Sequence, residues 1–399
     1  MMPSLAIRLE ARKPQEIEHM VLALGAGGSG RGYAPRLQCS MAAWTWLIPS
    51  LSLALLVVAM AVGVGAPLAA LSTVALIGAV IAAVHHAEVV AARVGEPFGT
   101  LVLAVAVTVI EASLILSLML AGGAEASAQS STLARDTLFA AVMIICNGVI
   151  GACVLAGGLA HHEQAFRVEG SGGGFAALIA MAALSLVLPD FTTTSGVGTY
   201  SRGQLVFTAV TSTALWAIFV FVQTVRHRDY FLAVPETADG EAHARTPTNL
   251  EAWASFGLLL VSLVSVVGLA KLLSPSIERA VAAVGAPKAV LGIIIAMLVL
   301  LPEAWAAVRA ARANRLQTSM NLAIGSALAS IGLTIPVVAV AAIALDIPLV
   351  LGLAPKDLVM LTVTFLVGAV TLGTGRTYVM QGAVHLVLFA AFLFLAFVP

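Results

Sequence analysis

The stretch GIIIAMLVLLPEAW, residues 292–305, places one acidic side chain, Glu303, at the end of a long apolar run. A similar stretch, GTLVLAVAVTVIEAS, covers residues 99–113 and carries Glu111. A charged side chain at the centre of a bilayer costs about 2.5–3.5 kcal/mol on insertion scales, so such residues face a cavity and usually have a function. From residue 98 onward these are the only acidic residues inside apolar runs, which makes them the principal candidate functional residues.

The composition of the whole chain indicates a membrane protein. Of 399 residues, 60% are hydrophobic and only 10% are charged, whereas soluble domains carry about 25% charged residues. The charges lie between long apolar runs, which predicts a single polytopic membrane domain. Twenty basic residues balance twenty acidic ones, so nothing indicates a nucleic-acid partner. Three cysteines are too few for a disulfide framework.

Eleven apolar runs are long enough to span a lipid bilayer. Because each run is continuously apolar, without the alternation of outer-membrane strands, we predict an all-α bundle. The predicted spans are residues 44–62, 67–92, 98–122, 137–159, 174–189, 204–225, 253–273, 287–308, 319–345, 358–374 and 377–398.

The predicted spans divide the chain into four parts. Residues 1–43 are expected to be a disordered cytoplasmic tail; its glycine-rich stretch 25–32 lacks the Lys-Ser/Thr pair of a phosphate-binding loop. Residues 44–225 form the first transmembrane half, residues 226–252 a cytoplasmic linker and residues 253–399 the second half. Eleven spans place the two termini on opposite sides. Fourteen Lys and Arg residues fall on the N-terminal side and six on the other, so we predict a cytoplasmic N-terminus and an outside C-terminus.

An internal repeat relates the two glutamate-bearing runs. Each is followed by another small-residue run, TLFAAVMIICNG at 137–148 and NLAIGSALASIG at 321–332, and these two align without a gap. The glutamates lie on the third and eighth spans, and an odd offset of five inverts the second copy in the membrane. We therefore predict two inverted-topology repeats of about five helices, with one extra N-terminal helix and a binding site near the midplane.

Two prolines predict where helices of the second repeat are interrupted. Pro302 and Pro336 lack an N–H group, so each leaves the carbonyl oxygen four residues earlier without its usual donor. These oxygens are candidate cation ligands. The first repeat has no such prolines, so an interruption there would rely on glycine and threonine.

Two facing carboxylates favour exchange of cations for protons. Desolvation and mutual repulsion both disfavour the doubly charged pair, so a proton or a cation can neutralise it and the two compete. Ca²⁺ requires six to eight oxygen ligands, of which Glu111 and Glu303 can supply up to four. For Asn147, bridging between helices and lining of the site stay equally open. The further candidate ligands are Thr108, Asn321, Ser326 and Asn147.

Other functions find less support in the sequence. A passive cation channel would use the acidic residues as a selectivity ring, but such rings are usually built from several subunits. An enzyme is disfavoured because no nucleophile–base pair is apparent, and Phe166 stands where a zinc protease would have its second histidine after His162. His385 is alone in the last span and is expected to be a packed polar residue rather than a ligand.

Several long motifs resemble the bacterial ChaA-type calcium/proton antiporters of the cation/calcium exchanger superfamily. The resemblance covers roughly residues 44–399. The motifs are GEPFGT at 95–100, TVIE at 108–111, DTLFAAVMIICNG at 136–148, RHRDYF at 226–231, LPE at 301–303 and NRLQTSMNLAIGSALASIGLTIP at 314–336.

The resemblance implies ten or eleven helices in a bacterial inner membrane and alternating-access export of Ca²⁺, Na⁺ or K⁺ against protons, without a cofactor. It implies cation- and proton-binding roles for Glu111, Glu303 and Ser326. The superfamily often has asparagine three residues before each glutamate, where this chain has Thr108 and Leu300. Exchange of Na⁺ or K⁺ with little Ca²⁺ activity is therefore an alternative.

Overall fold

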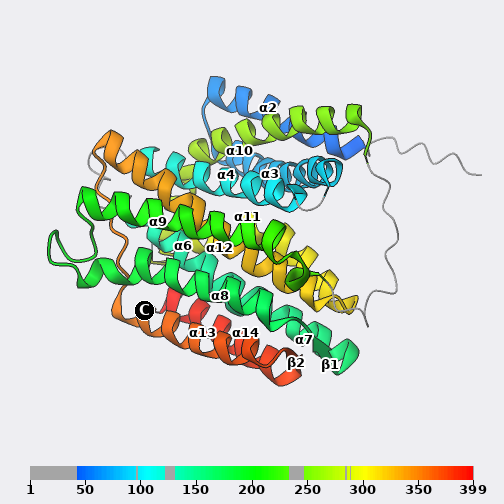
Figure 1. Cartoon of the computed structure of the whole chain (residues 1–399). Helices are drawn as coiled ribbons and strands as arrows, with labels where there is room; N and C mark the ends of the chain where they lie inside the picture. The colour runs from blue at the N-terminus through cyan, green and yellow to red at the C-terminus, as the bar shows by residue number, and fades with distance from the viewer. Residues whose placement is uncertain are drawn as a thin grey trace, which may run out of the picture. The chain divides into compact units, whose positions relative to one another are not determined.

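The computed structural model describes residues 43–95, 98–121, 131–232, 247–283, 285–287 and 289–398. These residues form a bundle of long helices (Figure 1). The predicted disordered tail 1–43, apart from its last residue, and residues 233–246 of the predicted linker lie outside this part of the chain.

Ten helical segments among the described residues are long and apolar enough to cross a membrane, and the 24-residue α4 is an eleventh helix. This confirms the predicted all-α membrane bundle. The helices are α2 (Ala43–Val62), α3 (Ala66–Val94), α4 (Phe98–Ala121), α6 (Leu133–Met143) continued by α7 (Ile150–His161), α8 (Val168–Ala182), α9 (Arg202–Phe221), α10 (Asn249–Ala283), α11 (Ala289–Arg312), α12 (Leu316–Leu345), α13 (Pro355–Gly373) and α14 (Val379–Phe397).

Short irregular elements interrupt or extend several of these helices. A π-helical turn, η2 (Ile144–Val149), joins α6 to α7, and two more, η3 (Ala183–Val187) and η5 (Val222–Arg226), follow α8 and α9. The 3₁₀ turns are η4 (Leu188–Phe191) and η6 (Arg228–Phe231). Two three-residue strands, β1 (Glu163–Ala165) and β2 (Arg376–Tyr378), pair antiparallel, with Gln164 opposite Thr377.

The two halves of the bundle run in opposite directions. We call the end at which α2 begins the N-side and the end at which α14 ends the C-side. On the N-side, Arg93 Nε near the end of α3 donates a hydrogen bond of 2.7 Å to Asn249 Oδ1 at the start of α10. Because α3 ends where α10 begins, the five helical segments from α3 to α9 and the five from α10 to α14 have inverted orientations.

The packing of the repeated helices is itself repeated. Helix α12 packs on α4 and α9, and its counterpart, the α6–α7 segment, packs on α11 and α14. The aligned glycines make equivalent contacts: a Cβ at Gly332 would lie 2.6 Å from Trp216 Cβ of α9, and one at Gly148 would lie 3.3 Å from the Phe389 ring of α14. Small residues at such positions allow close helix packing within a membrane.

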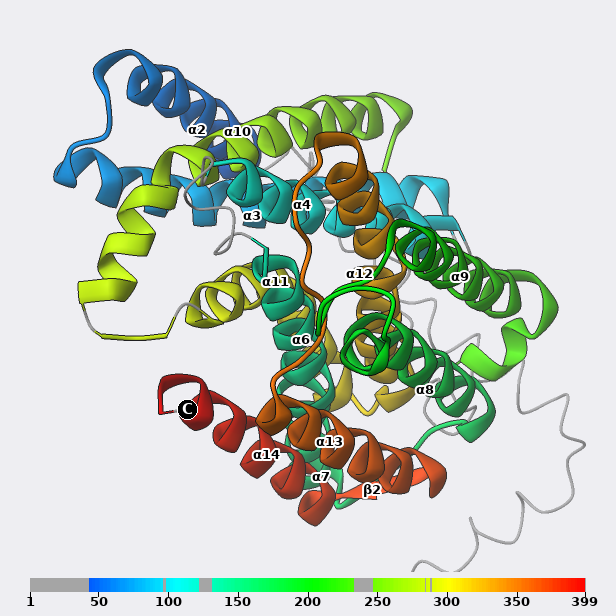
Figure 2. The same ribbon diagram turned by 90° about the vertical axis from the view of Figure 1, so that its left-hand side faces the viewer.

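Seen along the bundle, the helices form layers (Figure 2). Helices α2, α3 and α10 pack on one another at one side, and α13 and α14 lie together at the opposite side. Helices α4, α11, α12 and the α6–α7 segment fill the centre, where the most extensive buried cluster lies. Both glutamate-bearing helices, α4 and α11, are therefore central.

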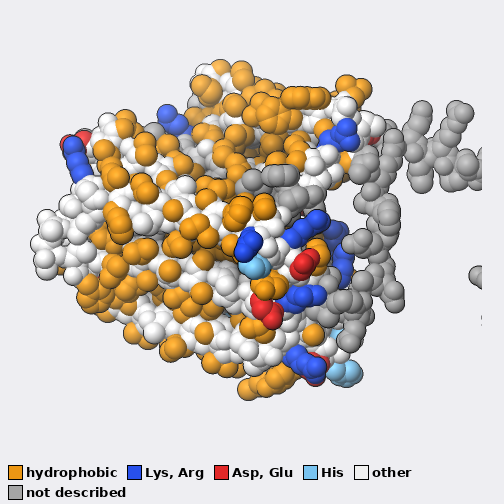
Figure 3. All heavy atoms as spheres, viewed as in Figure 1, with side chains coloured by type: hydrophobic (Ala, Val, Ile, Leu, Met, Phe, Trp, Pro, Cys, Tyr) orange, Lys and Arg blue, Asp and Glu red, His pale blue; other side chains and the backbone are white. Residues whose placement is uncertain are grey.

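The outer surface of the bundle matches a lipid environment. Hydrophobic side chains cover most of the face in Figure 3, and charged side chains gather at the N-side, near β1 and β2. Large apolar side chains such as Val210, Val264 and Phe394 are more than half exposed. An apolar surface of this extent would be unfavourable in water and favourable against lipid tails.

The predicted helix interruptions at proline are wrong. Helices α11 and α12 continue through Pro302 and Pro336, because neighbouring helices allow a transmembrane helix to tolerate proline. Along the α6–α7 and α12 pair, the irregular backbone lies in the first repeat, at η2. The extra helix α2 is held to α3 by His86, whose Nε2 lies 2.7 Å from the Thr45 carbonyl oxygen.

Candidate cation-binding site

Helix α12 presents two serine hydroxyls to the two glutamates. Ser326 and Ser330 are four residues apart and thus share one helix face, one turn from each other. The Ser326 hydroxyl donates a hydrogen bond to Glu303 Oε2 of α11. The Ser330 hydroxyl donates a 2.6 Å bond to Glu111 Oε2 of α4. One helix therefore holds a carboxylate from each repeat.

Glu111 lies away from solvent inside the bundle. Glu111 is only 1% exposed, and its Oε1 has no hydrogen-bond partner among the described residues. Glu303 is partly buried and close enough to Glu111 for electrostatic repulsion. A buried carboxylate without full hydrogen bonding is costly in its charged form. The arrangement therefore favours a bound proton or a bound cation over two free charges.

The hydroxyls of the site come from one repeat only. In the gap-free alignment of 137–148 with 321–332, the positions equivalent to Ser326 and Ser330 are Val142 and Cys146. Both are buried, at 1% exposure, but neither offers an oxygen atom. Among the described residues the candidate site thus offers two carboxylates and two hydroxyls, and the two serines of α12 have no oxygen-bearing counterparts in the first repeat.

The other predicted site residues form hydrogen bonds elsewhere. Thr108 lies one turn before Glu111 and donates to the Ala104 carbonyl oxygen of its own helix at 2.8 Å. Asn321 Nδ2 donates to the Phe231 carbonyl oxygen at 2.6 Å. Asn147 Nδ2 donates to Thr364 Oγ1 at 2.8 Å, and its Oδ1 lies 3.2 Å from His385 Nδ1.

Of the predicted residues, the structure thus brings together Glu111, Glu303 and Ser326. It adds Ser330, which the sequence analysis did not single out. The sequence could have indicated Ser330, because it follows Ser326 by four residues and so lies on the same face of a helix. Among the described residues, no cluster of three or more His, Cys, Asp or Glu side chains is placed to hold a metal ion.

One more acidic residue lies near the pair on its N-side. Glu88, exposed near the end of α3, interacts electrostatically with Glu303 and with Arg309 of α11. It falls in the stretch of α3 after His85 and His86, beyond the uniformly apolar part of the predicted span. The interaction gives Glu303 a negatively charged neighbour in the direction of the N-side.

Comparison with known sequences agrees with this architecture. The family model described as sodium/calcium exchanger protein matches residues 64–225 and 254–398, one segment for each half. The Sinorhizobium fredii protein y4hA, named as an ionic transporter, is 49% identical over 89% of this chain and 96% of its own length. The sodium-potassium/proton antiporter ChaA of Escherichia coli is 34% identical over 82% of this chain and 89% of its own.

Solved structures share the fold at low sequence identity. The structure of native YfkE has a TM-score of 0.66 and 18% identity, and covers 89% of this chain and all of that chain. The H⁺/Ca²⁺ exchanger CAX has a TM-score of 0.66 and 16% identity, covering 88% of this chain and 87% of that one. With two matched segments, and with eleven apolar helices and inverted halves among the described residues, this chain belongs to the sodium/calcium exchanger family and is a multi-pass membrane antiporter rather than an enzyme.

Proposed function

We propose that this protein exchanges cytoplasmic cations for protons by alternating access, and that Glu111 and Glu303 bind cation and proton in competition. The observation that carries this proposal is the attachment of both carboxylates to one turn of α12, through Ser330 and Ser326. Glu111 and Glu303 lie near the middle of α4 and α11, which belong to different repeats, and this supports a binding site of the kind that transporters with inverted repeats have.

Competition between ligands supplies the coupling. The site is costly when both carboxylates are charged, so it releases a cation readily only when protons replace it. It releases protons readily only when a cation replaces them. If the protein changes between its two open conformations only when the two carboxylates are neutralised, cations cross the membrane in one direction and protons in the other.

The ligand set favours Na⁺ or K⁺ over Ca²⁺. Ca²⁺ needs six to eight oxygen ligands, whereas Val142 and Cys146 contribute none at the positions equivalent to Ser326 and Ser330. The 34% identical relative from Escherichia coli is named as a sodium-potassium/proton antiporter. Ca²⁺ is the second candidate, because two carboxylates balance its charge and because a 26% identical relative from Aphanothece halophytica is named as a Ca²⁺/H⁺ antiporter.

We further propose that the protein lies in a bacterial inner membrane with its N-side in the cytoplasm. Basic residues near the membrane are more frequent on the cytoplasmic side. Among the described residues the basic side chains at the N-side are Arg93, Arg167, Arg226, Arg228, Arg309, Arg312, Arg315 and Arg376, and those at the C-side are Arg135, Arg202, Lys271, Arg279 and Lys356.

Neutral substitutions of the two glutamates test the exchange directly. In everted vesicles with a pH-sensitive dye, Glu111→Gln and Glu303→Gln are each expected to reduce cation-driven proton movement to the level of vesicles without the protein. A glutamine side chain is neutral, so it neither takes up a proton nor carries the negative charge that binds a cation. Glu163→Gln is the matched control, because Glu163 is exposed and pairs only with the exposed Arg376 at 3.2 Å. Unchanged exchange in both glutamine variants would contradict the proposal, and cation flux that ignores the proton gradient would indicate a channel.

The two serines are expected to set cation affinity. Loss of one hydroxyl in Ser326→Ala or Ser330→Ala should raise the apparent KM for Na⁺ by about three- to tenfold, the range of one buried polar interaction. Ser171→Ala is the control, since Ser171 on α8 is as buried as Ser330 and makes no hydrogen bond among the described residues. An unchanged KM in both site variants would exclude the serines from the site.

Labelling of single cysteines tests the orientation. Cys146 and Cys153 are buried, so a Cys39→Ser background should react little with a membrane-impermeant maleimide. Asp229→Cys on the N-side is expected to react only in everted vesicles. Thr193→Cys on the C-side is expected to react in intact, outer-membrane-permeabilised cells, and the opposite pattern would reverse the proposed orientation.

A further inference from the structure

A second buried polar group lies apart from the two glutamates. It consists of Asn147 in η2, Thr364 and Thr371 in α13, and His385 in α14. These four side chains are at most 2% exposed. None of the side chains hydrogen-bonded to His385 carries a charge.

The hydrogen bonds of this group form a complete chain. Asn147 Nδ2 donates to Thr364 Oγ1 at 2.8 Å, so Asn147 Oδ1 is left to accept from His385 Nδ1, 3.2 Å away. The Thr371 hydroxyl then donates to His385 Nε2 at 3.0 Å. The Thr364 hydroxyl points to Met143 Sδ at 3.4 Å. A neutral imidazole with its proton on Nδ1 fits both side-chain partners, and the ring also has a hydrogen bond with the backbone of Cys146.

Close helix packing brings the imidazole to this place. A Cβ at Gly151 of α7 would lie 2.9 Å from His385 Cβ, and a Cβ at Gly382 of α14 would lie 2.5 Å from the backbone nitrogen of Leu155. Only glycine permits this approach. His385 therefore lies where α7 and α14 approach each other closely, and its ring forms hydrogen bonds with Asn147 and Thr371.

Asn147 lies inside the π-helical turn η2. A π turn holds one residue more than an α turn, is rarely stable by itself and occurs often at functional sites. The equivalent part of α12 is regular α-helix. The two hydrogen bonds of the Asn147 amide fix this turn to α13 and α14, which supplies the restraint that an isolated π turn lacks.

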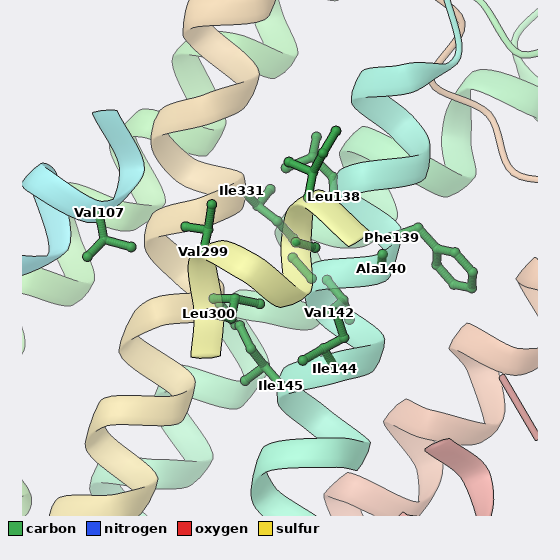
Figure 4. Close-up of a cluster of buried hydrophobic side chains, with 14 of the residues drawn as sticks. Val107, Leu138, Phe139, Ala140, Val142, Ile144, Ile145, Val299, Leu300 and Ile331 are labelled. Atoms are coloured by element: carbon green, nitrogen blue, oxygen red, sulfur yellow. The ribbon is translucent and has the colours of Figure 1, made fainter. Parts of the chain in front are cut away.

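The same turn also contacts the helix that carries Glu303. Leu300, one turn before Glu303 on α11, belongs to the same buried cluster as Ile144 and Ile145 of η2 (Figure 4), and η2 packs on α11. The turn η2 also packs on α12. A change from π to α geometry would remove one residue from the turn, shifting the chain by about 1.5 Å, and would displace these contacts.

We propose that Asn147 and His385 are positioning residues, which hold η2 in its π form and thereby set the position of Glu303 relative to α12. The proposal deepens the proposed exchange function and rests on it. Neither residue contacts the two glutamates. Their effect is transmitted through η2 and Leu300.

The test measures Na⁺/proton exchange in everted vesicles at several Na⁺ concentrations and pH values. His385→Ala, Asn147→Ala and Thr364→Ala are each expected to raise the apparent KM for Na⁺ by about fivefold while the maximal rate stays within about twofold. Thr362→Ala is the matched control, because Thr362 is on the same helix, is exposed and bonds only the Leu358 carbonyl oxygen. His385→Asn, whose amide nitrogen takes the place of Nδ1, should restore most of the affinity.

A double variant shows whether Asn147 and His385 act through one shared hydrogen bond or have two independent effects on the KM. Because Asn147 and His385 act through the same hydrogen bond, the double alanine variant should be no worse than the more damaging single one. The proposal would be overturned if the rise in KM of the double variant equalled the product of the rises in the two single variants. A KM within twofold of wild type in all three single alanine variants would also overturn it. A shift of the pH profile in His385→Ala alone would instead make the imidazole a proton carrier, which also overturns it.

A second measurement separates this proposal from the proposed function. Na⁺ binding to the purified variants, followed as a rise in thermal unfolding temperature, does not require transport. Absence of exchange by the wild-type protein would refute the proposed function. If Na⁺ still stabilises the wild-type protein and the alanine variants need about fivefold more Na⁺ for the same rise, the positioning role stands. If the variants need the same Na⁺ concentration as wild type, the positioning role fails even where exchange is observed.

Discussion

The hydrogen bonds from Ser326 and Ser330 to the two glutamates are the constraint on which the site depends. Each glutamate comes from a different repeat, on α11 and α4, and one turn of α12 brings them together. Such a pair is costly inside a bilayer unless it is neutralised. The surrounding apolar bundle creates this cost, and the proposed competition between protons and cations follows from it.

The inverted repeat explains how two distant glutamates reach one place, and its imperfections explain how the site differs from a symmetric one. Equivalent glycines, Gly148 and Gly332, pack on equivalent helices, α14 and α9. The polar residues are not equivalent. The second repeat uses the α12 face for serines that bind the carboxylates, whereas the first repeat uses Asn147 to attach a π turn to α13 and α14. Each repeat thus contributes one glutamate to the candidate site, whereas the two serines come from the second repeat and the attachment of η2 through Asn147 from the first.

Much of this arrangement is predictable from the sequence, because a bilayer imposes strong rules on apolar runs. The eleven helices, the inverted repeat and the choice of Glu111, Glu303 and Ser326 followed from hydropathy, spacing and parity. The placement of Asn321 did not, since its partner is the Phe231 carbonyl oxygen, which tertiary packing brings from ninety residues away. The π turn could not be predicted either, because the partners of its Asn147, which are Thr364 and His385, lie far along the chain. Pro302 and Pro336 were expected to break helices that neighbouring helices keep intact.

The central proposal is that cation and proton occupy the same carboxylates. Its most direct test is the release of protons when Na⁺ or Ca²⁺ is added to the purified protein in weakly buffered detergent solution, recorded with a pH-sensitive dye. The account predicts proton release that saturates with cation binding and disappears in the Glu111→Gln, Glu303→Gln double variant. Saturable cation binding to the wild-type protein without any proton release would contradict it.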